Sequence, residues 1–181
     1  LEDLTILAPS AGYSIDLDLC QRVRMRNVRS RGTAAAEGVR ITSSYDVVLE
    51  SFSSAQKTTT EAAGIIIGDA SRDVLVTGCR IERALQAIEI GNDYGAQDGI
   101  SKGVRITDCA IVWSGGIVIE AGARYVDIDD NLLQLDIAPS TASYAGILVG
   151  GVDVNISGNT IRDAEGVARE AGSRAKVAVS S

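Results

Sequence analysis

The chain has 181 residues, a net charge of −7, 45% hydrophobic residues but only 4% aromatic ones, and no histidine. The negative charge argues against nucleic acid or an anionic membrane surface as a partner, and no apolar run approaches the roughly 18 residues of a membrane-spanning helix. Without histidine there is no Ser-His-Asp or Cys-His site, and three cysteines without a Cys-x-x-Cys motif predict neither a zinc site nor a disulfide framework. We expect one aliphatic domain with no metal and no cofactor.

Residues 1–21 read as a partial first coil, and residues 22–45 as a basic coil that contains six arginines. On the basic coil, a contact with phosphate or an acidic sugar and a plain solvated face both remain open. From residue 22 onward a short strand pattern returns six times, each time with an apolar residue at every second position. The first inward residues of the six copies are Val23, Val47, Val74, Val104, Val126 and Val154.

A second strand pattern keeps pace with the first. Its inward residues are Ile15, Val39, Ile65, Ile88, Ile117 and Ile147. Alternation with period 2 predicts strands with one buried face. A unit that recurs every 22 to 30 residues predicts stacked repeats, because one repeat cannot bury its apolar face alone.

A third set of residues shares one position at the end of the first strand pattern. Its members are Val28, Phe52, Cys79, Cys109, Asn131 and Asn159. Gly78, Asp108, Asp130 and Gly158 precede the last four, and these residue types suit a left-handed backbone. We therefore expect a tight bend here. Cys79 and Cys109 are expected to be buried thiols within bridging range of each other.

These patterns resemble the pectate-lyase-like parallel β-helix repeat proteins, which include polysaccharide lyases, glycoside hydrolases and bacteriophage tailspikes. The resemblance covers residues 4–168 and implies an all-β, single-stranded, right-handed parallel β-helix of about six to seven coils. It also implies that the asparagines form a ladder in which side-chain amides bond along the stack. We expect a β-helix domain over residues 1–168, with residues 169–181 as a terminal partial coil or tail. Because the chain starts inside a coil, we expect a fragment of a longer protein or ends covered by partners.

Two carboxylates are candidates for catalysis on the second strand pattern, which usually forms the cleft face in this family. Glu89 and Glu120 face outward on neighbouring coils, offset by two residues. A separation of about 7 to 9 Å would suit the acid and base of an inverting glycosidase. The alternative is a pair of solvated surface glutamates.

Further residues are candidates for binding a sugar. Arg105, Asp127 and Asp129 face outward on the first strand pattern, where they could bind a sugar or calcium or be ordinary surface charge. Asp93 and Tyr94 lie in the long insertion 91–103, and Trp113 offers an aromatic platform or shields a corner of a coil.

An outward stripe of Ile66, Val118 and Leu148 predicts either an interface or a face that loops cover. Tailspikes of the resembled family associate as trimers, which implies a homo-oligomer here. The leading hypothesis is a rigid tailspike-like or surface-polysaccharide-binding segment, extracellular or on a virion surface. A glycoside hydrolase or polysaccharide lyase, and a purely structural or adhesive β-helix, are the alternatives.

Overall fold

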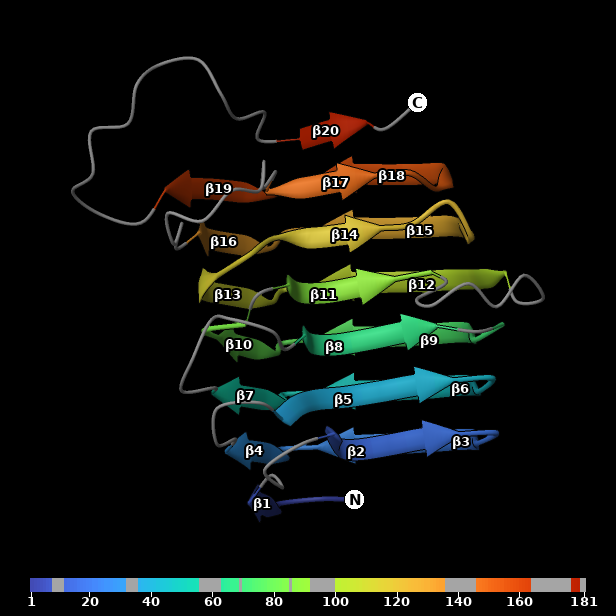
Figure 1. Cartoon of the computed structure of the whole chain (residues 1–181), viewed down its shortest axis with the longest axis vertical. Helices are drawn as coiled ribbons and strands as arrows, with labels where there is room; N and C mark the ends of the chain where they lie inside the picture. The colour runs from blue at the N-terminus through green and yellow to red at the C-terminus, as the bar shows by residue number, and fades with distance from the viewer. Residues whose placement is uncertain are drawn as a thin grey trace.

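The computed structural model describes residues 1–7, 12–31, 36–55, 63–68, 70–84, 86–91, 100–135, 146–163 and 177–179. These residues form three parallel sheets that wind together into a β-solenoid, with strands stacked one above another along the long axis (Figure 1). None of the described residues belongs to a helix that could cross a membrane. The prediction of an all-β parallel β-helix is confirmed, and its right-handed sense stays a prediction.

Each full coil contributes one strand to each sheet. The first sheet contains β2 (Gly12–Asp18), β5 (Ala36–Thr42), β8 (Ala63–Gly68), β11 (Gln86–Ile90), β14 (Ile117–Ile119), β17 (Ile147–Val149) and β20 (Val177–Val179). The second sheet contains β3 (Gln21–Arg26), β6 (Tyr45–Glu50), β9 (Arg72–Thr77), β12 (Ser101–Thr107), β15 (Ala123–Asp129) and β18 (Val152–Ser157). The third sheet contains β1 (Thr5–Leu7), β4 (Arg29–Arg31), β7 (Ser53–Ala55), β10 (Arg80–Glu82), β13 (Ala110–Ser114), β16 (Leu132–Leu135) and β19 (Thr160–Asp163).

The strand register confirms both predicted columns. In the second sheet, Val104 pairs with Val74 and Val126, and the column continues without a slip to Val23 and Val154. In the first sheet, the six predicted inward residues also pair coil by coil. Register is fixed this firmly because a shift of one residue would turn every buried aliphatic side chain to the surface.

The third sheet is an addition to the two predicted strand patterns. Its strands β1, β4, β7 and β10 have three residues each, with a single inward residue in the middle. In β4 and β7 that residue is a buried serine, Ser30 or Ser54, so neither strand shows an apolar alternation. The inward residues of later coils, such as Ile81 and Ile111, are fully buried.

The bend between the second and third sheets has the predicted left-handed backbone. Gly78, Asp108, Asp130 and Gly158 all have φ between 54° and 66°. At Gly158 a Cβ would come within 1.9 Å of Asp130 Oδ1, so a larger residue there would have to displace the Asp130 side chain. Asn131 and Asn159 follow directly in this bend.

The two asparagines form the predicted ladder. Asn131 is fully buried. Its Oδ1 accepts the Cys109 backbone N–H at 2.9 Å, and its Nδ2 donates to the Ile106 carbonyl at 3.0 Å and to Asn159 Oδ1 at 2.9 Å. Asn159 repeats the arrangement, since its Oδ1 also accepts the Asn131 N–H and its Nδ2 donates to the Ile128 carbonyl. The ladder thus satisfies buried backbone groups that the bend would otherwise leave without partners.

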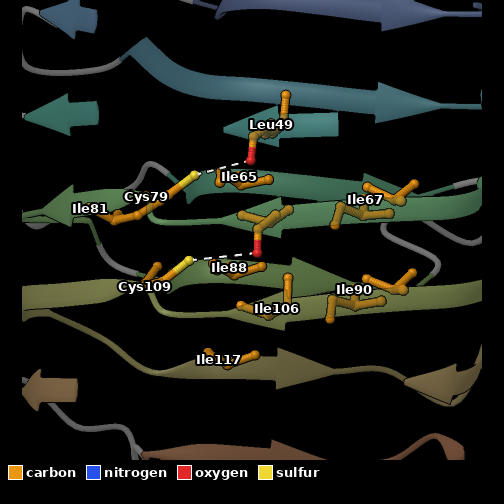
Figure 2. Close-up of a cluster of buried hydrophobic side chains, with 14 of the residues drawn as sticks. Leu49, Ile65, Ile67, Cys79, Ile81, Ile88, Ile90, Ile106, Cys109 and Ile117 are labelled. Atoms are coloured by element: carbon orange, nitrogen blue, oxygen red, sulfur yellow. Dashed lines mark hydrogen bonds between the residues drawn. The ribbon is translucent and has the colours of Figure 1, made fainter. Parts of the chain in front are cut away.

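The two cysteines continue this ladder toward the N-terminus. The thiol of Cys79 points at the Leu49 carbonyl at 3.6 Å, and that of Cys109 at the Val76 carbonyl at 3.8 Å (Figure 2). The four carbonyl groups belong to residues that pair in register, Leu49, Val76, Ile106 and Ile128. The two thiols and the two asparagine amides therefore all point at one stacked column of carbonyl groups. Both thiols are free and buried, as predicted. The contact with Cys109, and then burial, raise the pKa of Cys79 well above the usual thiol range.

Candidate functional site

The two candidate catalytic glutamates lie on the outer face of the first sheet. Glu89 on β11 pairs with Ile66 of β8 and Val118 of β14. Glu120 follows β14 directly and lies against Gly91. A Cβ added to Gly91 would come within 2.6 Å of the Glu120 Cβ. The offset of two residues on one face is therefore as the sequence predicts.

The surroundings of the two glutamates differ. Glu89 is only 7% exposed although it faces outward, and it takes part in an interaction within the chain. Glu120 is half-buried. Ile66, beside Glu89, is also buried. The hypothesis of two solvated surface glutamates is therefore wrong for Glu89.

At the N-terminal end of the same face, oppositely charged residues pair across one coil step. Asp16 and Arg40 are register partners. The Arg40 guanidinium donates from Nε to Asp16 Oδ1 at 3.0 Å and from Nη2 to Asp16 Oδ2, and its Cζ lies 4.2 Å from the centre of the Tyr13 ring. The hydrogen bond to Asp16 raises the pKa of Arg40. Arg40 is therefore paired with Asp16 at the N-terminal end of this face.

The charged candidates Arg105, Asp127 and Asp129 gather on the outer face of the second sheet. Arg105 pairs in register with Asp127. Its Nη2 lies 3.6 Å from Asp129 Oδ2, and Asp129 Oδ1 accepts the Ser157 hydroxyl. The Arg105 side chain is 58% exposed and that of Asp129 only 14%. Arg105 and Asp127 therefore offer polar groups to the solvent, while Asp129 holds Arg105 in place.

Trp113 is at the end of β13, on the third sheet, where the strand register shifts between Val112 and Ser114. The shift leaves Trp113 unpaired in a β-bulge, with φ of 51° and 41% of the residue exposed. The guanidinium carbon of Arg83 lies 5.7 Å from its ring centre, at cation–π distance. Arg83 is a neighbour that the sequence patterns did not single out; it follows Glu82, which pairs with Val112 on the next coil.

The predicted site residues therefore belong to three different faces of the solenoid. Glu89 and Glu120 are on the first sheet, the charged trio is on the second, and Trp113 is on the third. Asp93 and Tyr94 lie outside the described residues. Within the described ranges, no three carboxylate or thiol groups gather closely enough to hold a metal ion.

Comparison with known proteins adds little to this picture. No protein-family model matches the chain, and no curated protein matches it. Among solved structures, the chain is similar to QnrB1, a plasmid-mediated fluoroquinolone resistance protein, with 11% sequence identity and a TM-score of 0.27. The similarity covers 94% of this chain and 92% of the QnrB1 chain. At that TM-score the likeness supports neither a fold nor a function for this protein.

Proposed function

We propose that this chain is a rigid β-solenoid segment that binds a surface polysaccharide, as part of a tailspike-like protein outside the cell or on a virion. The observation that carries the proposal is the exposed indole of Trp113. A bulky residue in the left-handed region costs about 1 to 2 kcal/mol. The same left-handed backbone occurs at other corners of the described chain, such as Leu19 and Tyr125, so it fixes the position of Trp113, and the exposure of the indole carries the proposal.

The chemistry of Trp113 and Arg83 suits a sugar. One face of a pyranose ring is lined by C–H groups that pack on an indole, while the hydroxyls at its edge need hydrogen-bond donors and acceptors. Arg83 is exposed beside the ring and supplies donors. Because the bulge fixes the backbone at Trp113, little conformational freedom is lost on binding.

The outer face of the second sheet supports the same proposal. Arg105 and Asp127 form one row, with Asn155 paired next to Asp127. Successive coils, and therefore successive residues of this row, are about 4.8 Å apart. This spacing is close to the length of one sugar ring in an extended glycan. A chain of sugars that runs along the solenoid could therefore meet a donor or acceptor at each coil.

Self-association as a trimer is part of this proposal. Of the outward stripe on the first sheet, Ile66 is already buried within the single chain, while Val118 and Leu148 are half-buried. The stripe residues that remain accessible to a partner are therefore Val118 on β14 and Leu148 on β17. Mass measurement in solution tests this point, since a monomer at all concentrations would contradict it.

The chain's single tryptophan gives a direct test of glycan binding. Titration with a panel of neutral and acidic bacterial polysaccharides should shift or quench the emission of Trp113 saturably for at least one member. In a glycan pull-down with that polysaccharide, W113A should lose at least tenfold in affinity, while the matched control W113F keeps an aromatic platform and most of it. Unchanged binding by W113A, or no binding across the panel, would refute the proposal.

A second candidate function, glycan cleavage, is favoured by the unequal burial of Glu89 and Glu120. Inverting glycosidases use two carboxyl groups in different environments, one as the acid and one as the base. If the chain cleaves a polysaccharide, E89Q and E120Q should each abolish the release of reducing ends. The control D16N alters a carboxylate on the same face that is held by Arg40. Turnover that survives in both variants would remove this assignment.

A further inference from the structure

The outer face of the third sheet carries a hollow of about 300 Å³ between β4 and β10. Its floor is β7, where the outward residues Ser53 and Ala55 are short. On the coil before, Ser53 pairs with Arg29 and Ala55 with Arg31; on the coil after, they pair with Arg80 and Glu82. Long side chains on both sides of a short pair create the depression.

The hollow continues toward the neighbouring bend. A second depression of about 500 Å³ shares Arg29 and Ser53 with the first and is also lined by Asp3, Leu4 and Asn27. Arg29 therefore borders both depressions. The pair is open to solvent along one side of the solenoid, and a ligand larger than a single ion has room to enter.

The charge of this hollow is opposite to that of the protein. Three arginines and one glutamate line the first space, which gives a net charge of +2, and Asp3 in the second brings the two spaces together to +1, whereas the whole chain carries −7. Arg80 is already paired with Glu82. Arg29 and Arg31 form no ion pair with any described residue, in contrast to Arg26 on β3, which pairs with Glu2 and Glu50.

The spacing of the two unpaired arginines sets the kind of ligand. Arg29 and Arg31 alternate on one strand, so both side chains project from the same face with Cα atoms about 6.6 Å apart. Two guanidinium groups can then flank one anion, each with a two-pronged set of donors. A phosphate monoester carries a charge of about −1.5 to −2 and has three acceptor oxygens. It therefore matches two guanidinium groups better than a carboxylate, which carries a single charge.

We propose that this arginine hollow binds a phosphate monoester group through Arg29 and Arg31, with the Ser53 hydroxyl as a further donor from its floor. The site shares no residue with the glycan surface proposed above, although its Glu82 directly precedes Arg83. Loss of one site should leave the other intact.

The test is a titration followed through the arginine Nε–Hε signals in ¹⁵N NMR. Inorganic phosphate and glucose 6-phosphate should each shift the signals of Arg29 and Arg31 saturably in the millimolar range. If glucose 6-phosphate binds more tightly, its sugar also contacts the hollow; if the two bind equally, phosphate alone is recognised. Equal concentrations of acetate should produce a clearly weaker effect.

Three variants make the test specific. R29A and R31A should each weaken phosphate binding about tenfold or more, and S53L should do the same by filling the floor without changing the charge. The matched control is R24A, which removes an exposed arginine from β3 on the same coil but outside the hollow. The circular dichroism spectrum should confirm that all four variants keep the native fold.

Several results would overturn the proposal. Shifts that stay linear in phosphate, or that are equally large for all the protein's arginines, indicate general screening by salt. A loss of affinity in R24A equal to that in R29A indicates an effect of total charge. W113A should bind phosphate like the unmodified protein, so failure of the glycan proposal and failure of the arginine hollow can be told apart.

Discussion

Removal of the Asn131 side chain should destabilise the solenoid more than any other single change in its bend. N131A deletes the acceptor of the Cys109 N–H and the donor to the Ile106 carbonyl, and both groups are buried. A buried group left without a partner costs about 1 to 3 kcal/mol. Two such groups, with the lost bond to Asn159, give an expected loss of about 3 to 5 kcal/mol. That is a large part of the roughly 5 to 15 kcal/mol that stabilises a typical domain.

The assay is urea unfolding followed by far-ultraviolet circular dichroism, with two matched controls. N159A removes the neighbouring rung, which is only half-buried, so water can replace its bonds and the loss should be about 1 kcal/mol. C109A removes a thiol whose contacts with the carbonyls of Val76 and Thr107 are weak, and should cost about 1 to 2 kcal/mol as a small cavity. If N131A were no more costly than N159A, the ladder would not satisfy buried groups as described.

Three further predictions follow from particular residues. W113G should weaken polysaccharide binding yet leave the free energy of unfolding unchanged or raise it by about 1 kcal/mol. The reason is that glycine adopts the φ of 51° at this position without strain. A clear loss of stability in urea would show that the indole is structural. G91A should cost at least 2 kcal/mol, because its Cβ would come within 2.6 Å of Glu120 Cβ at a backbone φ of 125°; unfolding at the same urea concentration as the unmodified protein would contradict the packing of Glu120. At pH 8, a thiol reagent should label half-exposed Cys20 quickly but Cys79 and Cys109 only after unfolding. Both of these thiols are buried, and the contact with Cys109 and then burial raise the pKa of Cys79. Equally fast labelling of all three thiols, read by mass spectrometry, would contradict the burial of Cys79 and Cys109.

The columns of the first and second sheets were predictable because their inward positions are apolar in every coil, even in the three-residue strands β14 and β17. A strand such as β12 contains Val104 and Ile106 around an exposed Arg105, so its buried face can be read directly. The bend residues were also predictable, because glycine and aspartate before an asparagine are typical of a left-handed backbone. At these positions the repeat period, the buried face and the strand register all agree, so the predicted pairing of the coils matches the observed one.

The third sheet could not be predicted in the same way. Strands β4 and β7 have only one inward position each, and Ser30 or Ser54 at that position gives no hydrophobic signal. The role of the cysteines was missed for a related reason. The sequence places Cys79 and Cys109 in one column with the asparagines, but a thiol is read there as a core filler, and only the structure shows that it points at the same stacked carbonyls.

The candidate site was predictable only as a set of outward residues. Alternation places Glu89 on the outer face, but its burial depends on how the rest of the chain packs over that face. Likewise, nothing in the local pattern marks Trp113 as the residue of a β-bulge, because a tryptophan is among the least expected residues at positive φ. The arginine hollow depends on three strands more than 20 residues apart, so only the register brings Arg31, Ala55 and Glu82 into one row.

The stacking of coils in one continuous register is tested most directly by a distance between two exposed residues of one column. Arg24 and Asn155 are five register steps apart in the second sheet, which corresponds to about 24 Å at about 4.8 Å per coil. Spin labels at these two positions, in a C20S background, should give a narrow distribution centred near that value by pulsed electron spin resonance. A broad distribution, or a mean well beyond the reach of the labels from about 24 Å, would contradict the solenoid.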